Sequence, residues 1–140
     1  MTSIAVVPPQ RMAVGLTILR IVVGIVFIAH GYQKLFVFGF HGVAGAFGQM
    51  GIPMAPVVGP AIAILEFVAG IALLLGLGTR IFAALLALDM LGAIALVHLR
   101  NGFFLPMGFE FAFTLLGACL VLVVAGAGDY AFDTRRPRDL

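Results

Sequence analysis

The sequence predicts an all-helical membrane protein, a single domain of 140 residues folded as an antiparallel, up-and-down four-helix bundle. Hydrophobic residues make up 63% of the chain and charged residues only 10%, whereas soluble domains carry about 25% charged residues. Four apolar segments reach the roughly 20 residues that cross a bilayer, and the short connections between them favour antiparallel neighbours. The expected spans are residues 12–34, 58–77, 80–99 and 108–127.

The first span follows a short tail. Pro8 and Pro9 should keep residues 1–10 out of the helix. The apolar run from Met12 to Lys34 is longer than the core of a signal peptide, which has about 7–15 residues. We therefore expect this segment to be retained as a membrane helix.

The loop over residues 35–57 is apolar and rich in Gly and Phe. We expect a short interfacial helix over residues 43–50, with Phe side chains at the membrane surface. Gly51 and Pro53 would end it, since Gly after a helix and Pro just beyond are stop signals.

The later connections are shorter. Thr79 is placed to cap the third span, and Asn101-Gly102 predicts a turn before the fourth. Residues 128–140 are predicted to form a polar tail whose last residues are disordered.

Basic residues concentrate on one side of the predicted bundle, five against two. The five are Arg11, Arg80, Arg135, Arg136 and Arg138, and the two are Lys34 and Arg100. Because Lys and Arg favour the cytoplasmic side of a membrane, we expect both termini in the cytoplasm. The C-terminal arginines would act as an anchor to anionic lipid, or would contact an acidic partner.

Three ionisable residues interrupt the spans: Arg20, Glu66 and Asp89. A charge at the centre of a membrane helix costs about 2.5–3.5 kcal/mol on insertion scales, so it marks function or a specific partner. Each residue lies about 12–13 Å from one end of the bundle, so we expect the three to meet as a buried charge network. The network is either a structural staple, because an Arg fork binds two carboxylates, or part of a proton or substrate pathway.

A second polar group is predicted at the end of the bundle away from the termini. His30 and Lys34 end the first span on one helical face, His98 ends the third, and Glu110 opens the fourth. We expect an outer pocket above Glu66, since imidazoles and carboxylates exchange protons near neutral pH. The predicted catalytic residues are Glu66, His30, His98 and Glu110. The predicted substrate-binding residues are Lys34, Arg100, Asn101, Tyr32 and Phe104. The alternative is that these side chains only anchor the helix ends at the headgroups.

Other kinds of chemistry find no support in the sequence. The one cysteine, Cys119, lies in an apolar run and is expected to be a buried hydrophobe rather than half of a dithiol pair. No metal-ligand motif, phosphate loop or dinucleotide fingerprint is visible. The net charge is only +2 and no basic stripe is present, which argues against a nucleic-acid partner.

From Leu19 to Leu35 the chain reads LRIVVGIVFIAHGYQKL, which resembles the opening signature of the DoxX family. Further segments resemble that family in its own order: Phe47–Pro53, Leu77–Arg80, His98–Phe104 and Gly108–Glu110. The positions that match the family pattern are Arg20, His30, Lys34, Glu66, His98, Asn101 and Glu110. Asp89 departs from it, because an apolar residue is more usual at that position.

This resemblance covers about residues 12–132 and implies a four-span protein of the bacterial inner membrane. Some members of the family are described as membrane subunits of thiosulfate:quinone oxidoreductase. Others are described as membrane partners of enzymes of sulfur metabolism or oxidative stress.

Three functions follow from the residues and the resemblance together. The first is a membrane component of a quinone-linked oxidoreductase, with a quinone as the candidate cofactor and none covalently bound. The second is a non-catalytic membrane anchor or partner of a soluble redox or sulfur-metabolism enzyme. The third is a small-solute transporter, for which four helices would have to associate as a homo-oligomer.

Overall fold

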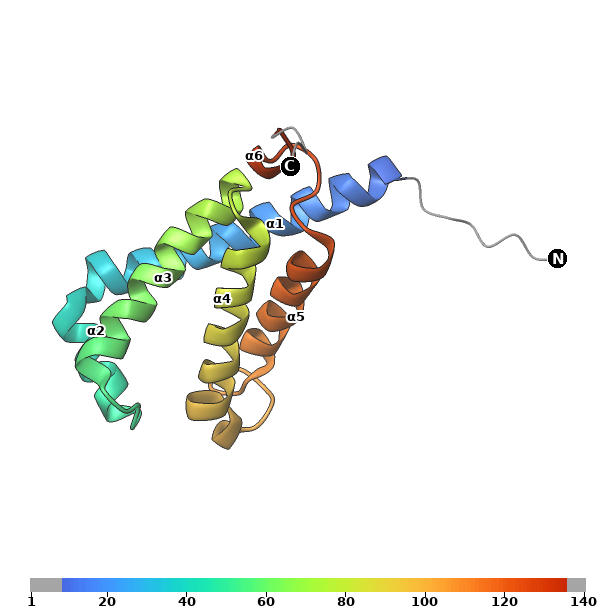
Figure 1. The fold of residues 1–140 in the computed structure, drawn as a ribbon. Coiled ribbons are helices and arrows are strands. Elements are labelled where there is room, and N and C mark those ends of the chain that lie inside the picture. The colour runs from blue at the N-terminus through green and yellow to red at the C-terminus, as the bar shows by residue number, and fades with distance from the viewer. Residues whose placement is uncertain (1–8, 136–140) are drawn as a thin grey trace.

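The structure is a computed structural model that describes residues 9–135, and all regular structure within this range is helical (Figure 1). The predicted all-helical class is therefore confirmed. The helices are α1 (Pro9–Tyr32), α2 (Gly39–Gln49), α3 (Ala55–Leu75), α4 (Thr79–Ala93), α5 (Glu110–Ala125) and α6 (Phe132–Arg135). Wider π-helical turns occupy Gln33–Phe38 and Ile94–His98, and a 3-10 turn occupies Leu99–Asn101.

Three helical runs are long and apolar enough to cross a membrane: Pro9–Gln49, Ala55–Leu75 and Thr79–Asn101. The chain is therefore a multi-pass membrane protein in a lipid bilayer. The segment predicted as the fourth span contains α5, which is apolar but has 16 residues. The first run begins at Pro9, where proline is tolerated because the first helical amide needs no partner.

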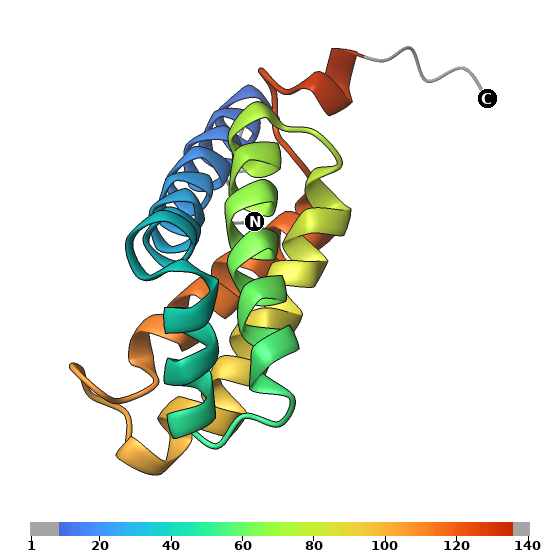
Figure 2. The ribbon, with the colours of Figure 1, turned by 90° about the vertical axis from the view of Figure 1, so that its left-hand side faces the viewer.

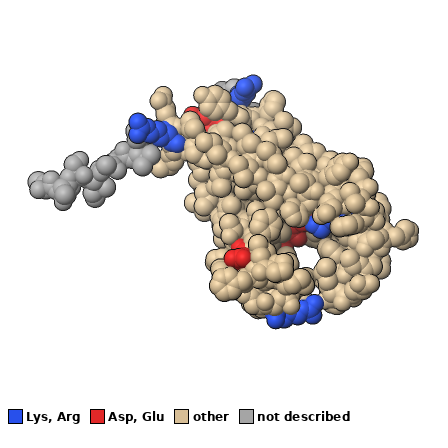
Figure 3. All heavy atoms as spheres, turned by 180° about the vertical axis from the view of Figure 1, so that it is seen from behind, with Lys and Arg blue, Asp and Glu red and all other residues tan. Residues whose placement is uncertain are grey.

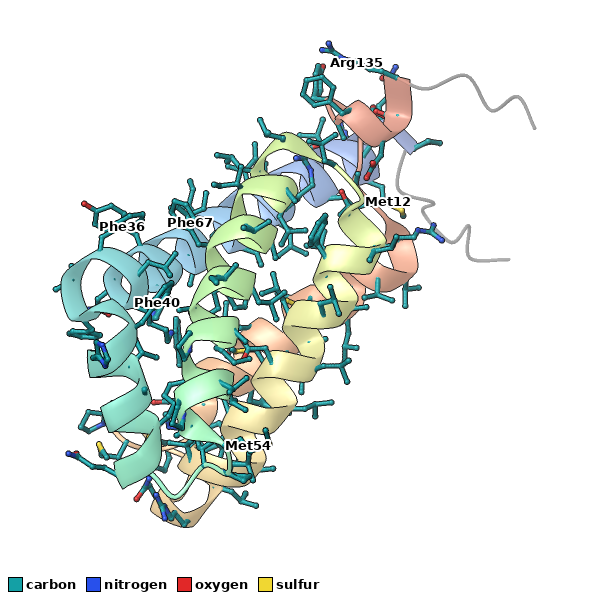
Figure 4. The ribbon with its side chains drawn as sticks, turned by 60° about the vertical axis from the view of Figure 1, so that its left-hand side comes forward. Met12, Phe36, Phe40, Met54, Phe67 and Arg135 are labelled. Carbon is teal, nitrogen blue, oxygen red and sulfur yellow. The ribbon has the colours of Figure 1, made fainter. Side chains whose placement is uncertain are left out.

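The predicted helix at 43–50 is present and longer, Gly39–Gln49. The chain bends sharply before it at Gly39, whose φ of 69° suits glycine. Helix α2 then lies alongside the first half of α3 (Figure 2). The buried side chain of Val43 packs on α3 at Gly59. Phe36 and Phe40 project from the bend (Figure 4), and both are more than half exposed on the isolated chain, so lipid would cover them.

The bundle consists of two helix pairs. Helix α3 packs most extensively against α1, and α4 packs against α5. The pairs meet near the chain termini and diverge toward the opposite end (Figure 1). We call these the terminal end and the loop end. The core between the pairs is formed by residues that include Val23, Phe27, Leu73, Leu86 and Leu122.

The terminal end is closed by residues 126–135, although residues 126 and 127 were predicted to end the fourth span and residues 128–135 to belong to a polar tail. Thr17 Oγ1 donates to the carbonyl of Asp129 at 2.6 Å. The Asp133 carboxylate accepts from the amides of Gly78 and Thr79 at 2.7 and 2.8 Å. Asp133 therefore caps α4, and the predicted cap by the Thr79 side chain is wrong. Arg136 and Arg138, and the predicted tail over residues 1–8, lie outside the described residues.

Candidate functional site

The predicted network of Arg20 with Glu66 and Asp89 is wrong. Arg20 is only 1% exposed, and its guanidinium donates four hydrogen bonds of 2.6–3.2 Å to backbone carbonyls. These carbonyls belong to Leu73, Leu74, Ala127 and Tyr130 at the terminal end. Leu73 lies about two turns beyond Glu66 on α3, about 10 Å along the axis. The physical reason is that the end of α3 and residues 126–135, which fold back over Arg20, together satisfy its donors, so it needs no carboxylate.

Glu66 instead pairs with Lys34. Lys34 Nζ lies 2.5 Å from Glu66 Oε2, and the two side chains are 20% and 5% exposed. Lys34 belongs to the π-helical turn after α1, and Glu66 lies at the middle of α3. Asp89 of α4 lies beside Glu66 and also faces the charge of Lys34. The structure therefore brings two of the three predicted network residues together and replaces the third, Arg20, by Lys34.

These three residues line a cavity of about 620 Å³ between the two helix pairs. Its polar lining residues are His30, Lys34, Glu66, Asp89 and His98. Its apolar walls come from every long helix and include Phe27, Phe47, Ile62, Leu88 and Phe111. Figure 3 shows a hollow passing through the molecule across the helix axes, with acidic and basic side chains at its rim.

Both histidines of the cavity are held in a defined orientation. His30 Nδ1 lies 2.9 Å from the carbonyl of Val26, and His98 Nδ1 lies 3.0 Å from the carbonyl of Met107. Because a carbonyl can only accept, each Nδ1 carries the proton of that hydrogen bond. In the neutral ring, Nε2 is then left as an acceptor. His30 also packs against the ring of Phe111, with 5.8 Å between centroids.

The other predicted site residues lie outside the cavity lining, and each has a local structural contact. Glu110 Oε1 accepts from the amide of Leu105 at 2.7 Å and so holds the loop before α5. Asn101 Nδ2 donates to the carbonyl of Val97 at 3.2 Å within its own turn. Arg100 donates to the carbonyl of Met50 at 3.4 Å, which links the end of α2 to the end of the α4 run.

The two predicted aromatic binding residues are not among the residues that line the cavity. Tyr32 stacks with Phe36, with 5.0 Å between centroids, and its side chain is about half exposed. Phe104 is 76% exposed. Their positions at helix ends, among aromatic side chains, fit the alternative interpretation of anchoring at the membrane interface.

Phe27 was not among the residues predicted for the site from the sequence. Phe27, His30 and Lys34 share one face at positions i, i+3 and i+7, and this spacing could have identified Phe27 as a lining residue.

The fold and the site define a class of protein: a multi-pass helical membrane protein with an ionisable, laterally open cavity between two helix pairs. The family model for DoxX matches residues 15–99, and the chain belongs to the DoxX family.

Relatives with similar sequences cover most of the chain. The protein named "Putative oxidoreductase CatD" from Bacillus subtilis is 36% identical over 127 residues, covering 89% of this chain and 88% of the relative. An uncharacterized membrane protein of Mycobacterium tuberculosis is 34% identical, covering 84% of this chain and 78% of its own length. An uncharacterized protein of Haemophilus influenzae is 36% identical, covering 86% and 89%. No solved structure matches the chain significantly.

Proposed function

We propose that the chain is the membrane component of a quinone-linked oxidoreductase system and that the cavity binds the quinone ring. The observation that carries the proposal is the combination of an ionisable triad, Lys34, Glu66 and Asp89, with a hollow that opens sideways. A ligand dissolved in the bilayer reaches such a cavity without leaving the lipid. The name of the Bacillus subtilis relative and the membership of the DoxX family support a redox role.

The residues of the cavity fit a quinone. A volume of about 620 Å³ lies within the range of about 300–1,000 Å³ that is usual for small-molecule sites. Phe27 and Phe111 offer flat apolar surfaces for the ring. The polar groups are few, which is the pattern of a site that orients an otherwise apolar ligand. An isoprenoid tail would leave through the lateral opening into lipid.

A bound quinone would supply the redox chemistry, because it takes up two electrons and two protons as it becomes a hydroquinone. The chain supplies hydrogen bonds and protons. The Lys34 ammonium has two N–H groups beyond the one that meets Glu66, and one of them can donate to a carbonyl oxygen. Glu66 and Asp89 are adjacent carboxyls that can hold and pass a proton. Electrons would come from a soluble redox enzyme or a reduced small molecule that acts with this chain.

The lateral hollow favours this proposal over solute transport. A transporter needs a path along the helix axes from one membrane face to the other, with sites alternately open to each. Here the terminal end is closed by Arg20 and the segment packed on it, and the hollow runs across the axes instead (Figure 3).

We also propose that the terminal end faces the cytoplasm of a bacterial cell, with the chain in the inner membrane. Arg80 and Arg135 lie at this end, in the first turn of α4 and on α6. Lys34 and Arg100 belong to the loop end. Single cysteines at Arg80 and Arg100, in a chain whose Cys119 is replaced by Ala, would report the orientation through labelling by an impermeant thiol reagent.

The proposed function is tested by quinone binding to the purified protein in nanodiscs, with Glu66→Gln and His98→Ala beside the wild type. We expect saturable binding by the wild type and at least tenfold weaker binding by both variants, with thermal stability unchanged in His98→Ala and lowered in Glu66→Gln, which removes the partner of Lys34. Absence of binding to the wild type would overturn the proposal. Earlier melting of both variants would then identify the ionisable residues as a structural staple in a membrane anchor.

A further inference from the structure

The polar groups of the cavity offer more hydrogen-bond acceptors than donors. His30 and His98 each donate a hydrogen bond from Nδ1 to a backbone carbonyl. In each neutral ring, Nε2 is therefore an acceptor that is available to other partners.

Asp89 adds to the acceptors. Its Oδ2 is buried without a hydrogen-bond partner within residues 9–135. Any proton held between the adjacent carboxyls of Asp89 and Glu66 is used within that pair. Against these acceptors, the cavity lining has one side chain that only donates, Lys34, and one of its three N–H groups is already used by Glu66.

An unmatched acceptor in a cavity of low dielectric is costly, and a ligand that donates a hydrogen bond to it removes that cost. The carbonyl oxygens of a quinone only accept, so they compete for the N–H groups of Lys34. The hydroxyl groups of a hydroquinone donate as well as accept. The acceptor excess therefore distinguishes the two forms of the same ring.

We propose that this cavity is selective for the dihydroxy, reduced form of its ligand: it binds an alkyl hydroquinone more tightly than the corresponding quinone. The inference rests on the proposed function and specifies which form the site prefers. The two histidine Nε2 atoms and the carboxyls of the triad are the acceptors for the ligand hydroxyl groups.

The preference has a redox consequence. Tighter binding of the reduced form raises the reduction potential of the bound couple, so that the bound quinone becomes a better electron acceptor than the free one. For a two-electron couple, a tenfold preference corresponds to a shift of about 30 mV. The site would then favour flow of electrons from its partner toward the quinone.

The test compares three ligands of one shape on the wild-type protein in nanodiscs without oxygen. They are a decyl-substituted hydroquinone, its quinone, and its dimethyl ether, which has the ring but no hydroxyl donors. The buffer is alkaline enough to keep a free imidazole neutral. We expect the hydroquinone to bind at least tenfold more tightly than the other two.

Two variants and a control locate the acceptors. His30→Phe and His98→Phe keep a ring and remove Nε2, and each should reduce the preference at least threefold. His41→Phe is the control, because His41 is exposed on α2 and lies outside the lining of the cavity. It should leave the preference unchanged.

The possible failures are distinguishable. If the quinone binds as tightly as the hydroquinone, or more tightly, the selectivity is overturned and the proposed function stands. If none of the three ligands binds, both are overturned. The comparison of ligands on the wild-type protein does not depend on any variant folding correctly.

Discussion

Lys34 and Glu66 form an ion pair that joins the end of α1 to the middle of α3 inside the cavity, with 2.5 Å between Nζ and Oε2. Glu66 is almost fully buried, and a second carboxyl, that of Asp89, lies beside it. The pair therefore places one cation against two acids in a region that is otherwise apolar. Both the stability of the bundle and the polarity of the cavity depend on it.

Removing one partner of this pair should lower the free energy of unfolding more than removing both partners. Lys34→Met leaves two buried carboxyls without a cation, and stranding a buried charge costs about 3–5 kcal/mol. Because Lys34 is partly exposed, we expect a loss near 3 kcal/mol in the free energy of unfolding. The double variant Lys34→Met with Glu66→Leu should lose less than the single variant. Reversible unfolding in detergent measures both, and strictly additive losses would contradict this coupling.

Arg20 should be essential for folding and replaceable neither by an apolar residue nor by lysine. Arg20→Met removes a donor from four backbone carbonyls, of which that of Leu73 still accepts from the Gly76 amide, at about 1–3 kcal/mol for each buried group that stays unsatisfied. We expect a loss above about 3 kcal/mol, with only part of it recovered by Arg20→Lys, whose ammonium lacks the fork. Arg80→Met is the matched control, because Arg80 is exposed, and it should stay within about 0.5 kcal/mol. Equal effects of the two methionine variants would disprove a specific role for Arg20.

Asp133, which lies outside the spans, should make the terminal end sensitive to acid. Burial alone would raise the pKa of its carboxyl, but the amides of Thr79 and Gly78 and the charge of Arg20 outweigh this and hold the pKa below its ordinary value. A depressed pKa favours the ionised form in the folded state. The stabilisation is therefore present above the unfolded pKa of about 3.9 and is lost as the pH falls through the folded value.

Hydrogen exchange of residues 126–135 at a series of pH values measures this contribution. We expect protection of the wild type to fall as the pH drops below about 4, while Asp133→Asn gives lower protection at neutral pH and a flatter dependence. Asp129→Asn is the control, because Asp129 accepts the Thr17 hydrogen bond through its backbone carbonyl. Identical pH dependence of the wild type and Asp133→Asn would show that another group causes the acid sensitivity.

The fold class and the loop-end site could be predicted from the sequence because both depend on local patterns. Apolar runs of membrane length predict helices, and His30 and Lys34, four residues apart, must share a face. His30, Lys34, Glu66 and His98 do line one cavity.

The partners of the charges could not be predicted in the same way. Depth along a helix places Arg20, Glu66 and Asp89 at similar levels, but it says nothing of the rotation of each helix or of a segment that folds back. Residues 128–135 were predicted as part of a polar tail and Ala127 as the end of the fourth span, yet the carbonyls of Ala127 and Tyr130 bind Arg20 across more than 100 positions. Backbone carbonyls carry no sequence signal, so a carboxylate was the natural partner to expect for Arg20.

Glu110, predicted to be catalytic, should instead position His98. It holds the loop by accepting from the amide of Leu105, and the carbonyl of Met107 in the same loop orients the His98 ring. Glu110→Ala should release this loop and weaken ligand binding, since a hydrogen bond to a charged group contributes about 1.5–3 kcal/mol. Glu110→Gln is the control, because its amide oxygen can still accept.

Nitrogen NMR of His98 and ligand titration together distinguish a positioning role of Glu110 from a role in proton transfer. Positioning predicts that Glu110→Ala changes the tautomer signal of His98 and that Glu110→Gln behaves as the wild type. If Glu110→Gln abolishes turnover while the His98 signal is unchanged, Glu110 acts in proton transfer and the positioning role is wrong.

The close approach of α1 and α3 should tolerate no methyl group at Gly24. A Cβ on Gly24 would lie 2.9 Å from the carbonyl oxygen of Gly70 and 2.9 Å from the amide nitrogen of Leu74, both on the backbone of α3. Because small residues let membrane helices pack backbone to backbone, Gly24→Ala must push the helices apart, at about 1–3 kcal/mol. Gly15 lies on the same helix, and a methyl group there would have no neighbour within 4 Å, so Gly15→Ala should be neutral or stabilising by up to about 1 kcal/mol. Thermal unfolding of the two variants measures the difference, and equal midpoints would mean that the two helices can separate at no cost.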